Sequence, residues 1–137
     1  MNNLQRTFDA MSEAARATRS QYHLTLGQLI DALHTAKRTS PVVFSDDTAA
    51  SPGDFLSYRG YYVDLAMQSV PHATVQDVYE HARLALNNLF EGYKGGTFHM
   101  GEDTPLWVSE YGSASGRAII GIEVGETVVL VVRQLKD

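Results

Sequence analysis

Two glycine-rich tracts combine cations with aromatic residues, a combination that can bind an anionic, planar molecule. The first tract, 52–64, is PGDFLSYRGYYVD, and the second, 92–112, is GYKGGTFHMGEDTPLWVSEYG. Arginine pairs with carboxylate or phosphate through a planar fork, and lysine adds a point charge. Tyrosine and tryptophan rings stack on nucleobases, and glycine lets backbone amides approach a ligand closely. We therefore predict that the two tracts meet around one pocket.

Each candidate ligand-binding residue has a role in this hypothesis. Arg59 and Lys94 would hold the anionic group, and Asp103 would bind a hydroxyl or amine edge of the ligand. The full set consists of Tyr58, Arg59, Tyr61, Tyr93, Lys94, Gly95, Gly96, Asp103 and Trp107. A purely structural alternative stays open for every one of them, because tyrosine favours strands, glycine favours turns and tryptophan often belongs to a core.

The sequence contains no motif that is specific for catalysis or for metal binding. It has no cysteine, and none of its five histidines forms a pair at metal-ligand spacing. The glycines at 92, 95 and 96 follow a predicted helix, whereas those of a P-loop precede one. Ser113 or Ser115 could be combined with His99 and Asp103 into a catalytic triad, but their spacing in the sequence gives no support for one. We expect no cofactor and no metal, and we favour a binding protein over an enzyme without settling that choice.

Composition favours one folded domain of 137 residues, since apolar residues make up 44% of the chain and charged residues 20%. The formal net charge of −5 argues against binding duplex nucleic acid. No apolar run approaches the roughly 20 residues of a membrane span, and the N-terminus does not resemble a secretory signal. We therefore expect a cytoplasmic protein that does not contact a membrane.

Hydrophobic periodicity predicts an α+β fold for residues 1–137, with two or three helices on a small mixed or antiparallel sheet. Residues 2–20 form a helix with a thin apolar stripe, so segment 1–21 needs a partner surface. That partner is either its own domain or a second copy of the chain, in which case the segment acts as an oligomerisation arm of a homo-oligomer. Thr25 and Gln28 predict a capping box at the start of a second helix.

The middle of the chain predicts two strands and a long helix. Residues 42–44 form a buried strand, residues 45–53 a loop and residues 61–67 an alternating strand. Thr74 caps the strongest predicted helix, whose apolar face continues as far as Tyr93.

The C-terminal third predicts short strands and a final β-hairpin. Residues 117–124 and 127–135 are apolar at nearly every position, which indicates strands that are covered on both faces. The long helix should supply one cover, and the first helix or a partner subunit the other. Gly125-Glu126 predicts a two-residue type II′ turn between them.

The segments SYRGYY at 57–62 and GYKGGTFHMGEDTPLWVSEYG at 92–112 resemble the signature of an uncharacterised family of small phage and bacterial proteins. The resemblance covers residues 24 to 132. It implies a stand-alone cytoplasmic domain of the phage accessory or counter-defence type, and it supplies a setting rather than a mechanism.

Two functions follow as hypotheses. The first is a non-enzymatic protein that binds an anionic nucleotide-like molecule and sequesters it. The second is a protein–protein interaction module that inhibits a host factor, with Tyr62 or Trp107 as an exposed anchor. An enzyme that uses His99 and Asp103 without a metal ranks third.

Overall fold

The computed structural model describes residues 19–59, 61, 63–86, 88–91, 97–110 and 114–135, with only the backbone given for 89–91 and 97–99. These residues form an α+β domain with two helices on a six-stranded mixed sheet, as the sequence predicts. The predicted helix at 2–20 and the proposed arm at 1–21 lie outside the described residues except for their last few positions. No helix in the described ranges is both long enough and apolar enough to cross a bilayer.

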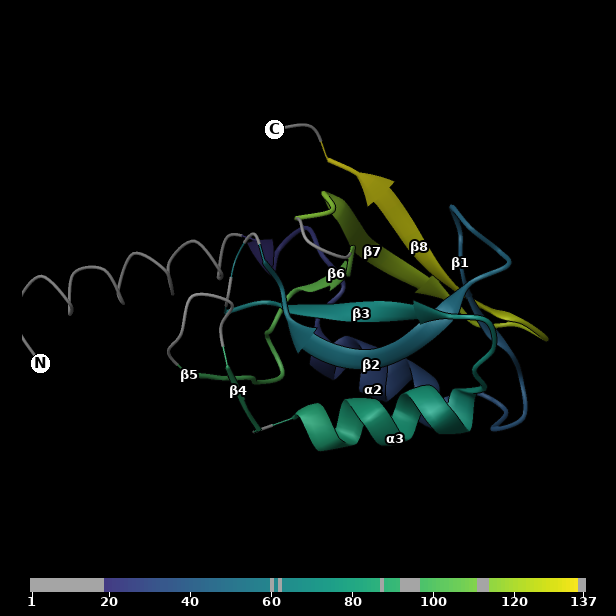
Figure 1. The fold of residues 1–137 in the computed structure, drawn as a ribbon. Coiled ribbons are helices and arrows are strands. Elements are labelled where there is room, and N and C mark those ends of the chain that lie inside the picture. Colours follow the sequence, from purple (N-terminus) through teal and green to yellow (C-terminus); the bar gives the residue numbers. More distant parts are fainter. Residues whose placement is uncertain are drawn as a thin grey trace, which may run out of the picture.

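Two capped helices cover one side of the sheet (Figure 1). Helix α2 spans Leu26–Thr35 and begins with the predicted capping box, in which Thr25 and Gln28 exchange hydrogen bonds. Helix α3 spans Val75–Ala85 and begins with a second box. Thr74 and Asp77 form this box.

Helix α3 ends about two turns earlier than the periodicity predicts. Its C-cap is Leu86, and the amide side chain of Asn88 donates a hydrogen bond to the carbonyl oxygen of Leu84. This bond satisfies a carbonyl that has no partner within the helix, so it stabilises the helix end at this point. The chain then turns into strand β4 (Leu89–Glu91), which pairs with β5 (Thr97–His99) in a small separate ladder.

The six-stranded sheet has the order β1-β8-β7-β6-β3-β2. β1 pairs parallel with β8 and β3 pairs parallel with β6, while the other neighbours are antiparallel. The strands are β1 (Val42–Phe44), β2 (Ser51–Ser57), β3 (Leu65–Val70), β6 (Leu106–Val108), β7 (Arg117–Glu123) and β8 (Val128–Gln134).

Three local predictions are wrong, and each error has a physical reason. Strand β2 starts inside the predicted loop 45–53, because its first residues lie at the sheet edge, where proline is tolerated. The predicted strand 61–67 begins only at Leu65, since Tyr61 and Asp64 belong to the turn that joins β2 to β3. The hairpin loop has four residues, 124–127, in place of the predicted two-residue type II′ turn, and Gly125 has no positive φ.

The sheet separates two apolar clusters. The main core lies between the helices and the face of the sheet that carries Leu106, Val108 and Ile119. The opposite face carries a smaller cluster, formed by Tyr58, Ala66, Trp107 and Ala118. The final hairpin was predicted to be covered on both faces, but the described residues cover it less completely. Val129 and Val131 are half-buried, and Ile120 is exposed.

A short extended segment before α2 joins the sheet region. The amide of Leu24 donates to the carbonyl of Ile119, and the amide of Leu106 donates to the carbonyl of Leu24. The next residue, Thr25, forms an antiparallel bridge with Pro105. These bonds fix Leu24 and Thr25 beside β6 and β7. The preceding residue, His23, contacts Trp107 of the smaller cluster.

Gly27 provides a test of this arrangement. A Cβ at this position would lie 2.9 Å from both the Cβ and the carbonyl oxygen of Glu102. Helix propensity alone predicts that Gly27→Ala gains up to about 1 kcal/mol. We expect a loss of roughly 1–3 kcal/mol instead, because the methyl group overpacks the turn at 101–104. Urea denaturation would measure this difference.

The matched control is Gly125→Ala in the hairpin loop, where the nearest atom would lie at an ordinary 3.6 Å. We expect this variant to stay within about 0.5 kcal/mol of the wild type. A stabilised Gly27→Ala variant would show that α2 does not pack closely on the turn.

Candidate functional site

Asp64 lies at the centre of the smaller cluster, and its side chain is 0% exposed. One carboxylate oxygen accepts hydrogen bonds from Arg19 Nε at 2.7 Å and from Trp107 Nε1 at 2.8 Å. The other accepts from Arg19 Nη2 at 2.9 Å. Removing a carboxylate from water costs several kcal/mol unless its charge is paired and its lone pairs are used. Here both requirements are met by residues that are distant in the sequence.

Trp107 lies on the sheet because its neighbours across the strands are small. Its register partners are Ala66 on β3 and Ala118 on β7, and both are buried. The alanines leave room for the indole to lie flat, and the ring of Tyr58 stacks on it at a centroid distance of 4.2 Å and an interplanar angle of 4°. The Tyr58 hydroxyl accepts a hydrogen bond from the amide of Gly116. The sheet therefore supports the indole of Trp107, and the amide of Gly116 fixes the ring of Tyr58.

Tyr61 extends this aromatic group toward solvent. Its ring centroid lies 5.8 Å from that of Trp107 and 6.1 Å from that of Tyr58. Tyr61 is 46% exposed, whereas Tyr58 and Trp107 are each 3% exposed. The guanidinium carbon of Arg19 lies 3.9 Å above the Tyr61 ring, which is a cation–π distance. The pair forms the solvent-facing side of the cluster.

His23 closes the cluster from the N-terminal side. Its ring lies 4.6 Å from Trp107, and its Nδ1 lies 3.1 Å from the carbonyl oxygen of Leu106. A carbonyl can only accept a hydrogen bond, so Nδ1 carries the proton in this arrangement. Burial lowers the pKa of His23, against the opposing effects of Leu106 and Asp64. The imidazole is therefore neutral at neutral pH, and Arg19 and Asp64 carry the charges of this site.

The structure brings together three of the predicted site residues, Tyr58, Tyr61 and Trp107. Arg59 lies next to Tyr58 in the β2–β3 turn and is half-buried. Asp103 is exposed in the turn before β6, where its backbone carbonyl accepts a hydrogen bond from the Ser20 hydroxyl. The other four predicted residues lie outside the described ranges: Tyr93, Lys94, Gly95 and Gly96.

The backbone places the two tracts at the same end of the molecule. Strand β4 contacts β2, and Figure 1 shows β4 and β5 at the end where β2 turns into β3. The register pairs Glu91 with Thr97, so the segment 92–96 connects the two strands of this ladder.

Burial changes the predicted roles of two aromatic residues. Tyr58 and Trp107 use their faces on one another and on the sheet, so neither forms an open pocket wall. For the same reason Trp107 cannot be the exposed anchor of an interaction surface. Tyr62, the other proposed anchor, lies outside the described residues, as do Ser113 and the side chain of His99.

Sequence reasoning missed three residues of the site: Arg19, His23 and Asp64. The pattern places Arg19 away from the apolar stripe of the predicted first helix, and Asp64 on the strand face that also carries Tyr62 and Ala66. Arg19 and Asp64 are 45 positions apart, and Asp64 and Trp107 are 43 apart. The one available signal was the tryptophan, since a buried indole N–H requires an acceptor.

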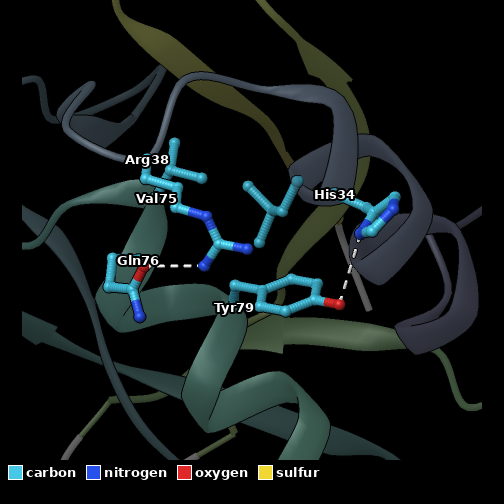
Figure 2. Close-up of a pocket in the computed structure, with 6 residues that line it drawn as sticks. His34, Arg38, Val75, Gln76 and Tyr79 are labelled. Carbon is cyan, nitrogen blue, oxygen red and sulfur yellow. Dashed lines mark hydrogen bonds between the residues drawn. The ribbon is translucent and has the colours of Figure 1, made fainter.

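A narrow hollow lies between the two helices (Figure 2). Its volume is about 10 Å³, which holds at most one water molecule. Arg38 donates to the Gln76 side chain beside it, and Tyr79 contacts His34. The helix-start amides of Val75 and Gln76 are already bonded to backbone carbonyls, so they do not offer an anion site.

A larger open hollow, of about 270 Å³, lies between β2 and the end of α3. Its lining includes Asp54, Phe55, His81 and Leu84. The His81 and Asp54 side chains approach to 3.6 Å, and both are exposed to solvent. The hollow thus has mixed chemistry and no set of polar groups that converges on one point.

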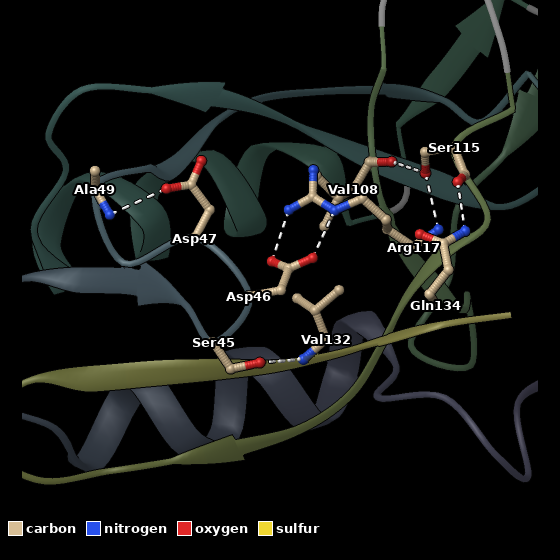
Figure 3. A network of polar contacts seen from close by, with 9 residues as sticks. All are labelled: Ser45, Asp46, Asp47, Ala49, Val108, Ser115, Arg117, Val132 and Gln134. Carbon is tan, nitrogen blue, oxygen red and sulfur yellow. Dashed lines mark hydrogen bonds and ion pairs between the residues drawn. The ribbon is translucent and has the colours of Figure 1, made fainter.

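A second bidentate ion pair provides a useful comparison with Arg19–Asp64 (Figure 3). Arg117 donates from Nε and Nη2 to the two carboxylate oxygens of Asp46, both at 2.7 Å. Asp46 is more exposed than Asp64, and the Asp46 hydrogen bond raises the pKa of Arg117. This pair fastens the loop after β1 to β7. Both pairs are bidentate, but the carboxylate of Asp46 is partly exposed, whereas that of Asp64 is buried.

No three His, Asp or Glu side chains come together as metal ligands within the described ranges. The comparisons with protein-family models, curated proteins and solved structures found no match to this chain.

The importance of Asp64 can be tested with Asp64→Asn. Asparagine is uncharged, so the partly buried guanidinium of Arg19 would lose its counter-charge. The new amide group would also direct N–H donors toward the donors of Arg19 or Trp107. We expect the free energy of unfolding to fall by roughly 3 kcal/mol, measured by urea denaturation. Asp46→Asn is the matched control at the exposed pair, with an expected change within about 1 kcal/mol. Equal losses in the two variants would contradict a special role for Asp64.

Proposed function

We propose that this protein binds a small anionic molecule with a planar ring, such as a nucleotide, and does not transform it. The proposed site lies at the end of the molecule where β2 turns into β3 and where Figure 1 also shows β4 and β5. Tyr61 offers an exposed ring for stacking, and Arg59 and Lys94 supply positive charge. Gly95 and Gly96 would let the backbone approach the ligand, and Asp103 would bind a polar edge.

The observation that carries this proposal is the fixed position of the Arg19 guanidinium on an exposed tyrosine ring. A buried ion pair contributes little net stability compared with apolar packing, so its presence calls for another explanation. Arg19, Asp64 and Tyr61 together supply a charge and a flat ring that need no rearrangement before binding.

The setting of the proposal comes from the sequence resemblance. A cytoplasmic phage accessory protein that sequesters a nucleotide requires binding without turnover, which fits a site built from stacking and charge. We propose further that the protein acts as a homo-oligomer through segment 1–21, since a thin amphipathic helix is stable only on a partner surface.

The proposal predicts that a nucleotide raises the melting temperature. At a ligand concentration of 100 times Kd, binding stabilises the folded state by about 2.7 kcal/mol, which corresponds to roughly 5–10 °C for a domain of this size. Differential scanning fluorimetry with nucleoside mono-, di- and triphosphates and cyclic nucleotides would detect this shift. An Arg59→Ala/Lys94→Ala double variant should fold normally and lose it.

The matched control is Lys37→Ala/Arg38→Ala, which removes the same charge from exposed positions after α2. This variant should keep the shift, because those residues lie outside the proposed site. The absence of a shift across the whole nucleotide panel would overturn the nucleotide proposal. A shift that both double variants lose equally would indicate a general charge effect.

A further inference from the structure

We infer that Arg19 is itself a ligand-binding residue, and that its outer guanidinium edge together with the Tyr61 ring recognises the phosphate and the base of a nucleoside monophosphate. This inference rests on the proposed function and deepens it. It is carried by the position of Arg19 between a buried carboxylate and an exposed aromatic ring.

The hydrogen bonds of Arg19 leave part of its guanidinium available. Within the described residues, the group donates to Asp64 through Nε and Nη2. Arginine has five N–H donors, so the two on Nη1 and one on Nη2 remain for another acceptor. The side chain is 14% exposed, so a small part of it reaches solvent.

Asp64 sets the orientation of this edge. A bidentate pair fixes the guanidinium plane, and an arginine held in this way loses little further freedom when a ligand binds. The guanidinium carbon lies 3.9 Å from the ring centroid of Tyr61, a residue that is 46% exposed. In the inferred complex, the base lies against the exposed part of Tyr61 and its phosphate accepts from the guanidinium.

The charge of Asp64 limits which anions can bind. The carboxylate already neutralises much of the arginine charge, so a weak anion gains little at the outer edge. A phosphate monoester carries about −1.5 to −2 charge at pH 7 and has three acceptor oxygens. It therefore gains more than a carboxylate ligand from the same three N–H groups, which favours a nucleoside monophosphate over a planar carboxylic acid.

The structural alternative is that Arg19 only tethers the chain before α2 to the sheet. Arg19→Lys separates the two explanations, because lysine keeps the positive charge but cannot form the planar fork or the same stacking contact. Arg117→Lys is the matched control. It breaks an equally bidentate pair with Asp46 on the opposite face of β7 from Ala118 and leaves the proposed site intact.

The experiment is isothermal titration of the full-length protein with AMP and with adenosine, in the wild type and in both lysine variants. We expect AMP affinity to fall at least tenfold in Arg19→Lys, with adenosine affinity little changed. Arg117→Lys should bind both molecules like the wild type.

AMP binding by Arg19→Lys at wild-type affinity, with binding lost in Arg59→Ala/Lys94→Ala, would overturn the role of Arg19 and leave nucleotide binding through Arg59 and Lys94 in place. A wild-type protein that binds no member of the nucleotide panel would overturn both.

If Arg19→Lys does not fold, the wild type supplies the second measurement. Saturating AMP should shift the Arg19 Nε–H resonance in a ¹⁵N spectrum, whereas the Arg117 resonance should stay in place. An unchanged Arg19 resonance in AMP-saturated protein would overturn the inference.

Discussion

The carboxylate of Asp64 is buried completely, and the protein has to compensate its charge with groups from other parts of the chain. The compensation comes from Arg19, before the first described helix, and from Trp107 on β6. Since an unpaired buried carboxylate would cost several kcal/mol, these three segments can form their native arrangement only together. The arrangement fixes Arg19, the exposed Tyr61 ring and the stack beneath it as one unit.

Strand alternation connects this unit to the main core. Leu106 and Val108 face the helices, so Trp107 between them must face the opposite side of the sheet. Ala66 and Ala118 flank it in register, and their small side chains allow the indole and Tyr58 to lie flat on the sheet. The apolar core thereby provides a rigid support for residues that face solvent, which is the usual relation between a scaffold and a binding site.

The sequence was sufficient for elements that depend on local interactions. The capping box at Thr25 and the N-cap at Thr74 were predicted, because the bonding partners of both residues lie three positions away. The end of α3 was missed, because the apolar face continues past the point where Asn88 bonds the last turn. Hydrophobic periodicity shows which face of a helix is apolar. It does not show where a side chain such as that of Asn88 bonds the last turn and ends the helix.

The candidate site shows the same division. The aromatic content of the two tracts led correctly to Tyr58, Tyr61 and Trp107 as neighbours, yet their mutual burial depends on a register that no local pattern contains. The pairing of Arg19 with Asp64 depends on how the chain before α2 is bonded beside β6. Single-sequence reasoning has no access to such contacts, because each residue taken alone has the pattern of an ordinary surface charge.

The most direct test of the central claim is a crystal structure of the protein grown with AMP. The account predicts a base stacked on Tyr61 and a phosphate hydrogen-bonded to the outer edge of Arg19, with the Arg19–Asp64–Trp107 contacts unchanged. Density for AMP at another place, or Arg19 released from Asp64 without any contact to the ligand, would contradict it.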